Sequence, residues 1–240
     1  MGSKMDKLRV TAVIPAYNEE NTIGNVLNAL KSCNLINEII VINDGSTDRT
    51  AEIVNQHNIG IININNNIGK GQAIKRVCSN LKTDILFLCD ADLIGLNQYH
   101  IKKILEPLLK GKAIMSIGLR DYGKLQNFLC YMKIFPLISG ERAIVYPVFK
   151  EILKSKYFYG YGMEAVMNHY CKKNKLHVES KVLDYNQIWK TKKFKRDGIK
   201  ALIKQSLYIG YVCFILKIKS KSKYVKNHPS EMGGIFGWAK

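Results

Sequence analysis

The sequence has no apolar stretch long enough to cross a membrane. The uncharged stretch between Lys204 and Lys217 has 12 residues, whereas a spanning helix needs about 20. The N-terminus also lacks the basic-then-apolar pattern of a secretory signal. We therefore expect a cytoplasmic protein, either in solution or peripheral on the inner face of the membrane.

Closely paired cysteines are missing as well. The six cysteines are spread along the chain, so neither a zinc knuckle nor a disulfide framework is predicted. Several lie inside apolar patterns, where we expect small, buried and reduced thiols. The cysteines are Cys33, Cys78, Cys89, Cys130, Cys171 and Cys213.

Acidic residues are scarce, with 19 Asp and Glu against 37 Lys and Arg and a net charge of +18. The excess is concentrated in residues 121–240, which hold 23 basic and 8 acidic residues. No base-stacking platform or reading motif accompanies these charges, so nucleic acid is not a predicted partner. We divide the chain into a domain over residues 1–189 and a basic, amphipathic C-terminal helical appendage over residues 190–240.

Two interpretations of the appendage remain open. Its apolar residues at 199, 202, 203 and 207 share one helical face. Such a helix suits an anionic membrane surface, to which each nearby basic residue adds about 1 kcal/mol. An ordinary helix packed on the domain, with solvated lysines, has the same pattern. The sequence leaves the oligomeric state open.

Strand-like and helix-like segments alternate through the first half of the chain. Strands are predicted at residues 10–15, 39–42, 59–64, 85–89 and 113–118, with helices at 23–30, 48–56, from 69, and 98–110. This order is typical of an α/β fold with a mostly parallel sheet. In such sheets, ligands bind outside the carboxyl ends of the strands.

Carboxylates follow two of these strands. Asp44 ends the second strand, and Asp90 and Asp92 follow the fourth, with Ala91 between them pointing away. Oxygen ligands of this kind suit Mg²⁺ or Mn²⁺, which keeps part of its coordination shell for substrate phosphates. The alternative is a surface turn with helix-capping aspartates.

Four motifs in this order resemble family 2 glycosyltransferases, including the transferases that act on polyprenyl phosphates or dolichol phosphate. They are Val13-Ile14-Pro15-Ala16-Tyr17-Asn18-Glu19-Glu20, Asn43-Asp44-Gly45-Ser46-Thr47-Asp48, Asn67-Ile68-Gly69-Lys70-Gly71 and Asp90-Ala91-Asp92. The resemblance covers residues 8–120, the donor half, and leaves residues 121–189 as the acceptor half. It implies the GT-A fold, with a mostly parallel central sheet flanked by helices, and a nucleotide-sugar donor.

The resemblance also implies roles for individual residues. Asp92 would hold the Mg²⁺ or Mn²⁺ ion, and Lys70 would approach the ribose or the diphosphate. From its sequence position alone, Lys70 could equally be a solvated residue at the start of a helix. The residues implied to bind the nucleotide sugar are Pro15, Ala16, Tyr17, Glu19, Asp44, Gly69, Lys70, Asp90 and Ala91.

The acceptor half contains a candidate base and a candidate anion site. Glu164 falls in the first turn of a predicted helix, where it would take a proton from the acceptor or simply favour the helix N-terminus. Arg142 would bind a phosphate or form a surface ion pair. The catalytic candidates are thus Glu164, Asp92 and Arg142; the acceptor candidates are Ser139, Gly140, Arg142, Tyr161 and Gly162.

One departure from the family pattern concerns the metal. Many relatives have a histidine after the last catalytic strand, where this chain has Gln187, with Asp184 nearby. The motifs predict a metal-dependent transfer from a nucleotide diphosphate sugar, and the resemblance to family 2 implies inversion at the anomeric carbon and favours UDP. The acceptor is a hydroxyl or a phosphate on a glycan, a small phosphorylated molecule or a lipid carrier. The alternatives are a nucleotidyltransferase and a catalytically silent nucleotide-sugar scaffold.

Overall fold

The computed structural model describes residues 8–120, 139–159 and 162–183. The basic appendage, Tyr161, Asp184 and Gln187 lie outside these residues, so the expectations for them remain predictions. Within the described ranges, no helix is both long and apolar enough to span a membrane.

The described chain is organised around a seven-stranded sheet with the order β3-β2-β1-β4-β6-β5-β7. Strands β1 to β4 pair in parallel, as do β5 and β7, whereas β6 is antiparallel to both of its neighbours. The strands are β1 Val10–Ala16, β2 Glu38–Asp44, β3 Gly60–Ile64, β4 Ile85–Leu88, β5 Met115–Arg120, β6 Arg142–Val145 and β7 Val178–Leu183.

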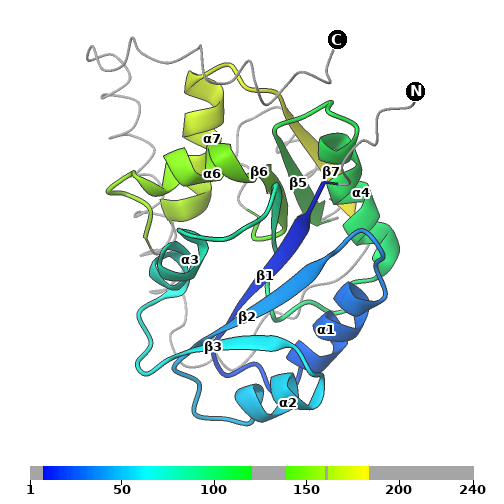
Figure 1. Cartoon of the computed structure of the whole chain (residues 1–240), viewed down its shortest axis with the longest axis vertical. Helices are drawn as coiled ribbons and strands as arrows, with labels where there is room; N and C mark the ends of the chain where they lie inside the picture. The colour runs from blue at the N-terminus through cyan, green and yellow to red at the C-terminus, as the bar shows by residue number, and fades with distance from the viewer. Residues whose placement is uncertain (1–7, 121–138, 160–161, 184–240) are drawn as a thin grey trace.

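Helices cover both faces of the sheet (Figure 1). One apolar core lies between the sheet and α1, α2 and α4, and the other lies between the sheet and α3, α6 and α7. The helices are α1 Ile23–Lys31, α2 Thr50–Gln56, α3 Lys70–Cys78, α4 Gln98–Leu109, α6 Tyr146–Leu153 and α7 Gly162–Lys173. The predicted α/β class with a mostly parallel, helix-flanked sheet is confirmed.

Two details differ from the sequence-based expectation. Pro15 lies inside β1 instead of ending it, and its register partner is Ile42 of β2. The ladder to β4 ends near Val13, whose carbonyl accepts the Cys89 amide. Because alternate residues face the same neighbour, the missing N–H of Pro15 points beyond that ladder and removes no bond from it. The antiparallel insertion of β6 was not expected.

Side-chain hydrogen bonds connect the loops after β1 and β2. Asn18, in the left-handed region at φ 56°, accepts the Thr47 amide and donates its own amide to Ser46. The Asp48 carboxylate accepts the Thr50 amide at 2.9 Å and the Glu20 amide at 3.1 Å. The rim of the sheet where β1 and β2 end is therefore a connected unit.

We expect Asp48→Ala to destabilise the fold in a pH-dependent way. Burial alone would raise the pKa of Asp48, but its hydrogen bonds from Thr50 and Glu20 lower it below the ordinary 3.8. The stabilisation is therefore present above that value and is lost as pH falls through the folded-state pKa. In urea unfolding at pH 7, the free energy of unfolding of Asp48→Ala should be about 2 kcal/mol below that of the wild type. That difference should shrink below pH 3.8, and a difference that grows on acidification would contradict the assignment.

The described cysteines match their expected environment. Cys33, Cys78, Cys89 and Cys171 are free and buried. Burial raises the pKa of Cys78 to about 12 and that of Cys171 to about 11, so these thiols stay protonated at neutral pH.

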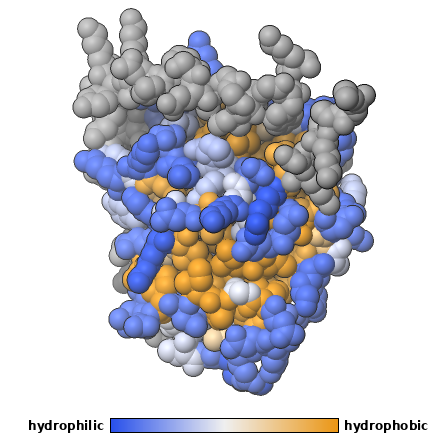
Figure 2. All heavy atoms as spheres, viewed as in Figure 1, coloured by the Kyte–Doolittle hydropathy of each residue, from blue (hydrophilic) through white to orange (hydrophobic). Residues whose placement is uncertain are grey.

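Figure 2 shows apolar side chains gathered across the middle of one face, over β1 to β3, with hydrophilic side chains around them.

Candidate active site

The predicted donor residues lie where the parallel strands end. Pro15 and Ala16 close β1, Asp44 closes β2, and Asp90 follows β4. Tyr17 comes directly after β1 and is 41 % exposed, whereas Ala16 is buried. The structure therefore brings the donor candidates to one edge of the sheet, as expected for a ligand site of an α/β fold.

Asp44 has a structural role that the sequence did not indicate. Its buried carboxylate accepts the backbone amides of Ile68 and Gly69, each at 2.9 Å. These bonds attach the end of β2 to the turn that opens α3. Gly69 has φ 87°, and among the described residues no atom outside Gly69 and its two neighbours lies within 4 Å of where its Cβ would be, so a backbone approach to a ligand is sterically open there.

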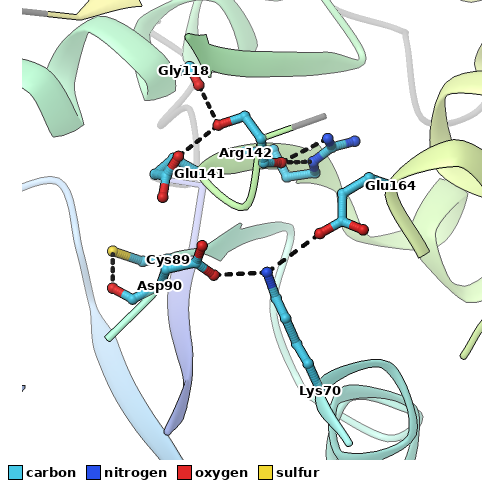
Figure 3. Close-up of polar contacts among 8 residues, drawn as sticks. Lys70, Cys89, Asp90, Gly118, Glu141, Arg142 and Glu164 are labelled. Atoms are coloured by element: carbon cyan, nitrogen blue, oxygen red, sulfur yellow. Dashed lines mark hydrogen bonds and ion pairs between the residues drawn. The ribbon is translucent and has the colours of Figure 1, made fainter. Parts of the chain in front are cut away.

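Lys70 bridges the two halves of the domain (Figure 3). From the first residue of α3, its Nζ lies 2.7 Å from Asp90 Oδ1 and 3.3 Å from Glu164 Oε1. Burial alone would lower the pKa of Lys70, but the charges of Asp90 and Glu164 raise it well above its ordinary value. Lys70 is thus the first residue of α3, as the alternative had it, but its ammonium is paired with two carboxylates instead of being freely solvated.

The Asp90-Ala91-Asp92 segment shows the predicted alternation of exposure. Asp90 and Asp92 are partly exposed and Ala91 is 3 % exposed, although the last two residues form a turn instead of extending the strand. Among the described residues, no cluster of three His, Cys, Asp or Glu side chains could enclose a metal ion. A carboxylate at an open rim nevertheless fits Mg²⁺ or Mn²⁺, which commonly takes its other ligands from substrate phosphates and water.

The segment of residues 139–141 packs against Asp90 through Gly140. A Cβ on Gly140 would lie 2.3 Å from Asp90 Oδ2, so any side chain there would displace the Asp90 carboxylate. The Ser139 hydroxyl lies 2.5 Å from both the Gly118 carbonyl and the Glu141 carboxylate, and the Gly118 amide donates to the Glu141 carbonyl. Ser139 and Gly140, which were expected to contact the acceptor, thus belong to a segment that packs on the Asp90 carboxylate through Gly140 and is bonded to β5 through Ser139 and Glu141.

Arg142 is fully buried, which corrects both sequence-based expectations of an accessible anion site or a surface ion pair. Its Nε and Nη2 donate to the Ser139 carbonyl at 2.9 and 2.7 Å, and its Nη1 donates to Asn168 Oδ1 at 3.2 Å. Burial lowers the pKa of Arg142, while Glu164 and Glu141 act in the opposite direction. The cause of the error is topological, because β6 lies in the interior of the sheet.

Glu164 occupies the first turn of α7, as predicted, and is 6 % exposed. Met163, Val166 and Met167 of the same helix are buried, Tyr170 is half-buried, and Gly162 is the first residue of the helix. Figure 3 shows the Glu164 carboxylate directed toward Lys70. A buried carboxylate beside a lysine at the sheet rim is a reasonable position for a general base.

Three members of this site were missed by sequence reasoning. Gly118 and Glu141 hold Ser139, and Asn168 binds Arg142. Asn168 could have been noticed because it lies four residues after Glu164, on the same helical face. Gly118 had no local signal, since its role depends on a strand pairing distant in sequence.

The glycosyl transferase family 2 model matches residues 11–178. Residues of this chain are 34% identical over 131 residues to a dolichyl-phosphate beta-glucosyltransferase of Trichomonas vaginalis, covering 46% of this chain and 39% of that protein. They are also 34% identical over 110 residues to the glucosyl-3-phosphoglycerate synthase of Mycolicibacterium smegmatis, covering 42% and 36%. The chain thus spans less than half the length of these two relatives. An uncharacterised protein of Methanocaldococcus jannaschii is 30% identical over 176 residues, covering 63% and 70%.

Solved structures give the same fold. The glucosyl-3-phosphoglycerate synthase of Mycobacterium tuberculosis, in complex with Mn²⁺, UDP-glucose and phosphoglyceric acid, has a TM-score of 0.68 at 20% identity. That likeness covers 86% of this chain and 80% of that one, and supports the expected GT-A architecture. Because the family model matches well over half of the chain, the protein belongs to glycosyl transferase family 2.

Proposed function

We propose that this chain transfers a sugar from a UDP-sugar to a hydroxyl or phosphate acceptor with inversion at the anomeric carbon. Glucose is the sugar that we propose. The observation that carries the proposal is the position of Lys70 between Asp90 and Glu164 at the rim of the sheet. Family membership supports it, as do relatives whose names specify glucosyl transfer to dolichyl phosphate or to 3-phosphoglycerate.

The donor is assigned to the rim formed by the ends of β1, β2 and β4. Tyr17 offers an exposed ring for the base, and Gly69 leaves room for the diphosphate. Asp92 is the assigned ligand of a Mg²⁺ or Mn²⁺ ion, which would stabilise negative charge on the diphosphate. The named complex of the mycobacterial synthase with Mn²⁺ and UDP-glucose supports this choice of ion and donor.

In the proposed reaction, an acceptor oxygen forms a bond to the anomeric carbon as the bond from that carbon to the diphosphate breaks. For a hydroxyl acceptor, the Glu164 carboxylate takes the proton that the attacking oxygen loses. Lys70 can stabilise the negative charge that develops on the departing diphosphate. A phosphate acceptor is already ionised at neutral pH and needs no base.

The experiment is transfer of radiolabelled glucose from UDP-glucose with Mn²⁺ to 3-phosphoglycerate or to a polyprenyl phosphate. We expect Asp92→Asn to lower turnover at least about 100-fold, because it weakens the metal site. Asp84→Asn is the matched control, since Asp84 precedes β4 at its opposite end and should not affect transfer. Equal turnover in the two variants would contradict the assignment of Asp92.

Glu164→Gln distinguishes the acceptor classes. It should reduce transfer to a hydroxyl acceptor and largely preserve transfer to a phosphate acceptor, because the latter has no proton to remove. The absence of transfer by the wild-type chain to every acceptor, with UDP-glucose bound, would favour a scaffold over an enzyme.

A further inference from the structure

We propose that Asn168 and Arg142 are positioning residues that fix the orientation of α7 and thereby place Glu164 at the reaction centre. This inference rests on the proposed function, because it takes Glu164 as the general base. It goes beyond the sequence-based assignment of Arg142 to an anion and gives Asn168 its first role.

The first step of the argument is the geometry of the Arg142 guanidinium. Two of its nitrogens, Nε and Nη2, donate to one carbonyl oxygen, that of Ser139, at 2.9 and 2.7 Å. A planar group held at two points has little rotational freedom. Its third nitrogen therefore points in a defined direction, and there Nη1 meets Asn168 Oδ1 at 3.2 Å.

The second step is the spacing on α7. Asn168 and Glu164 are four residues apart, so their side chains lie on the same helical face, about one turn from each other. A rotation of α7 about its axis would move both together. The bond from Arg142 to Asn168 opposes that rotation and so helps to maintain the 3.3 Å contact between Lys70 and Glu164.

The third step is the electrostatic environment of Glu164. Two positive groups act on the Glu164 carboxylate: Lys70 of α3 and the fully buried Arg142 of β6. The same two groups also interact with the negative charges of Asp90 and Glu141. The same Ser139 that anchors Arg142 precedes Gly140, against which Asp90 packs. Residues 139–142 thus link the position of Asp90 to that of Glu164 (Figure 3).

The test compares three substitutions in the full chain. Asn168→Leu removes the acceptor while keeping the branched shape of the side chain, and Asn168→Asp retains an oxygen for Arg142. Asn174→Ala removes an exposed amide beyond the end of the same helix. For a hydroxyl acceptor, we expect Asn168→Leu to lower kcat about 10- to 100-fold, as for a misplaced catalytic group. UDP affinity with Mn²⁺ should change less than kcat does, because general-base catalysis by Glu164 acts in the transition state.

Asn168→Asp should recover most of the lost kcat, and Asn174→Ala should match the wild type. Normal kcat in Asn168→Leu, or an equal loss in the aspartate variant, would overturn the proposal. Should leucine prevent folding, as judged by circular dichroism, Asn168→Ser provides the same loss of contact without bulk.

A second readout does not depend on turnover. Glutamate labelled with ¹³C at the carboxyl gives a resonance for Glu164 that is identified by its disappearance in Glu164→Gln. We expect this resonance to move in Asn168→Leu and to stay unchanged in Asn174→Ala. A resonance that does not move overturns the positioning role, whereas a moved resonance in a chain without transferase activity would mean that the proposed function is wrong and the positioning role correct.

Discussion

Replacing Lys70 with alanine is expected to lower turnover at least about 100-fold, the loss typical of removing one group that stabilises developing charge. The variant should also be less stable. Lys70 lies between Asp90 and Glu164, so without its ammonium the two carboxylates would face each other. The Lys70 side chain is 31 % exposed, so solvent would partly screen their repulsion. We expect the free energy of unfolding, measured with urea at pH 7, to fall by about 2 kcal/mol. This is less than the cost of breaking a fully buried ion pair.

The pH dependence of this loss has a defined sign. Because the folded-state pKa of Lys70 is raised, its stabilisation is complete below the ordinary lysine pKa of 10.5 and is lost only as pH rises through the folded value. The difference between wild type and Lys70→Ala should therefore be constant between about pH 6 and 9.

Two further variants distinguish the effect of Lys70 on stability from its effect on catalysis. Lys75→Ala, on an exposed position of the same helix, should leave both turnover and stability near wild type. Lys70→Ala combined with Glu164→Gln should regain part of the lost stability, since one of the two uncompensated charges is removed. The double variant should stay inactive toward a hydroxyl acceptor. Full stability of Lys70→Ala alone would show that the three charges are not coupled.

Gly140→Ala is expected to remove most activity while adding a single methyl group. The new Cβ would overlap the Asp90 carboxylate, with distances of 2.3 and 2.4 Å to its two oxygens. Asp90 would have to leave its place beside Lys70, and we expect turnover to fall at least about 100-fold, as for a displaced catalytic group. The measurement is kcat with UDP-glucose, together with the thermal unfolding midpoint.

Gly60→Ala is the matched control for that substitution. Gly60 lies in β3, and its added Cβ would make an ordinary contact at 3.6 Å with the Ile39 carbonyl. Its turnover should match the wild type. Normal kcat in Gly140→Ala would mean that Asp90 can move without consequence, and would argue against its assignment to the donor.

The sequence was sufficient to predict the layers of the fold because they depend on local patterns. Apolar runs and helical spacing in residues 10–118 identified the elements that form β1 to β5 and the helices between them. The position of β6 could not be predicted in this way. Its antiparallel pairing with β4 and β5 depends on contacts across more than twenty residues, and the short segment Arg142–Val145 has no distinctive pattern.

Candidate site residues could be predicted from the sequence where they belong to motifs that follow strands. Contacts between side chains from distant parts of the domain could not be predicted in this way. Lys70 and Glu164 are separated by 94 residues, and neither local sequence indicates the other. Arg142 was misjudged for a related reason, since a charged residue is usually assigned to the surface unless its buried partners are known. Ser139 and Asn168 supply those partners.

The shared ammonium of Lys70 also has a consequence for how tightly nucleotides are held. Under the proposed function, a diphosphate bound by Lys70 would weaken the contacts of Nζ with Asp90 and Glu164, and this loss would lower the measured affinity for the nucleotide. If the proposed transfer takes place, the same two carboxylates would compete with the UDP product for the lysine. An arrangement of this kind favours rapid departure of the product over tight retention.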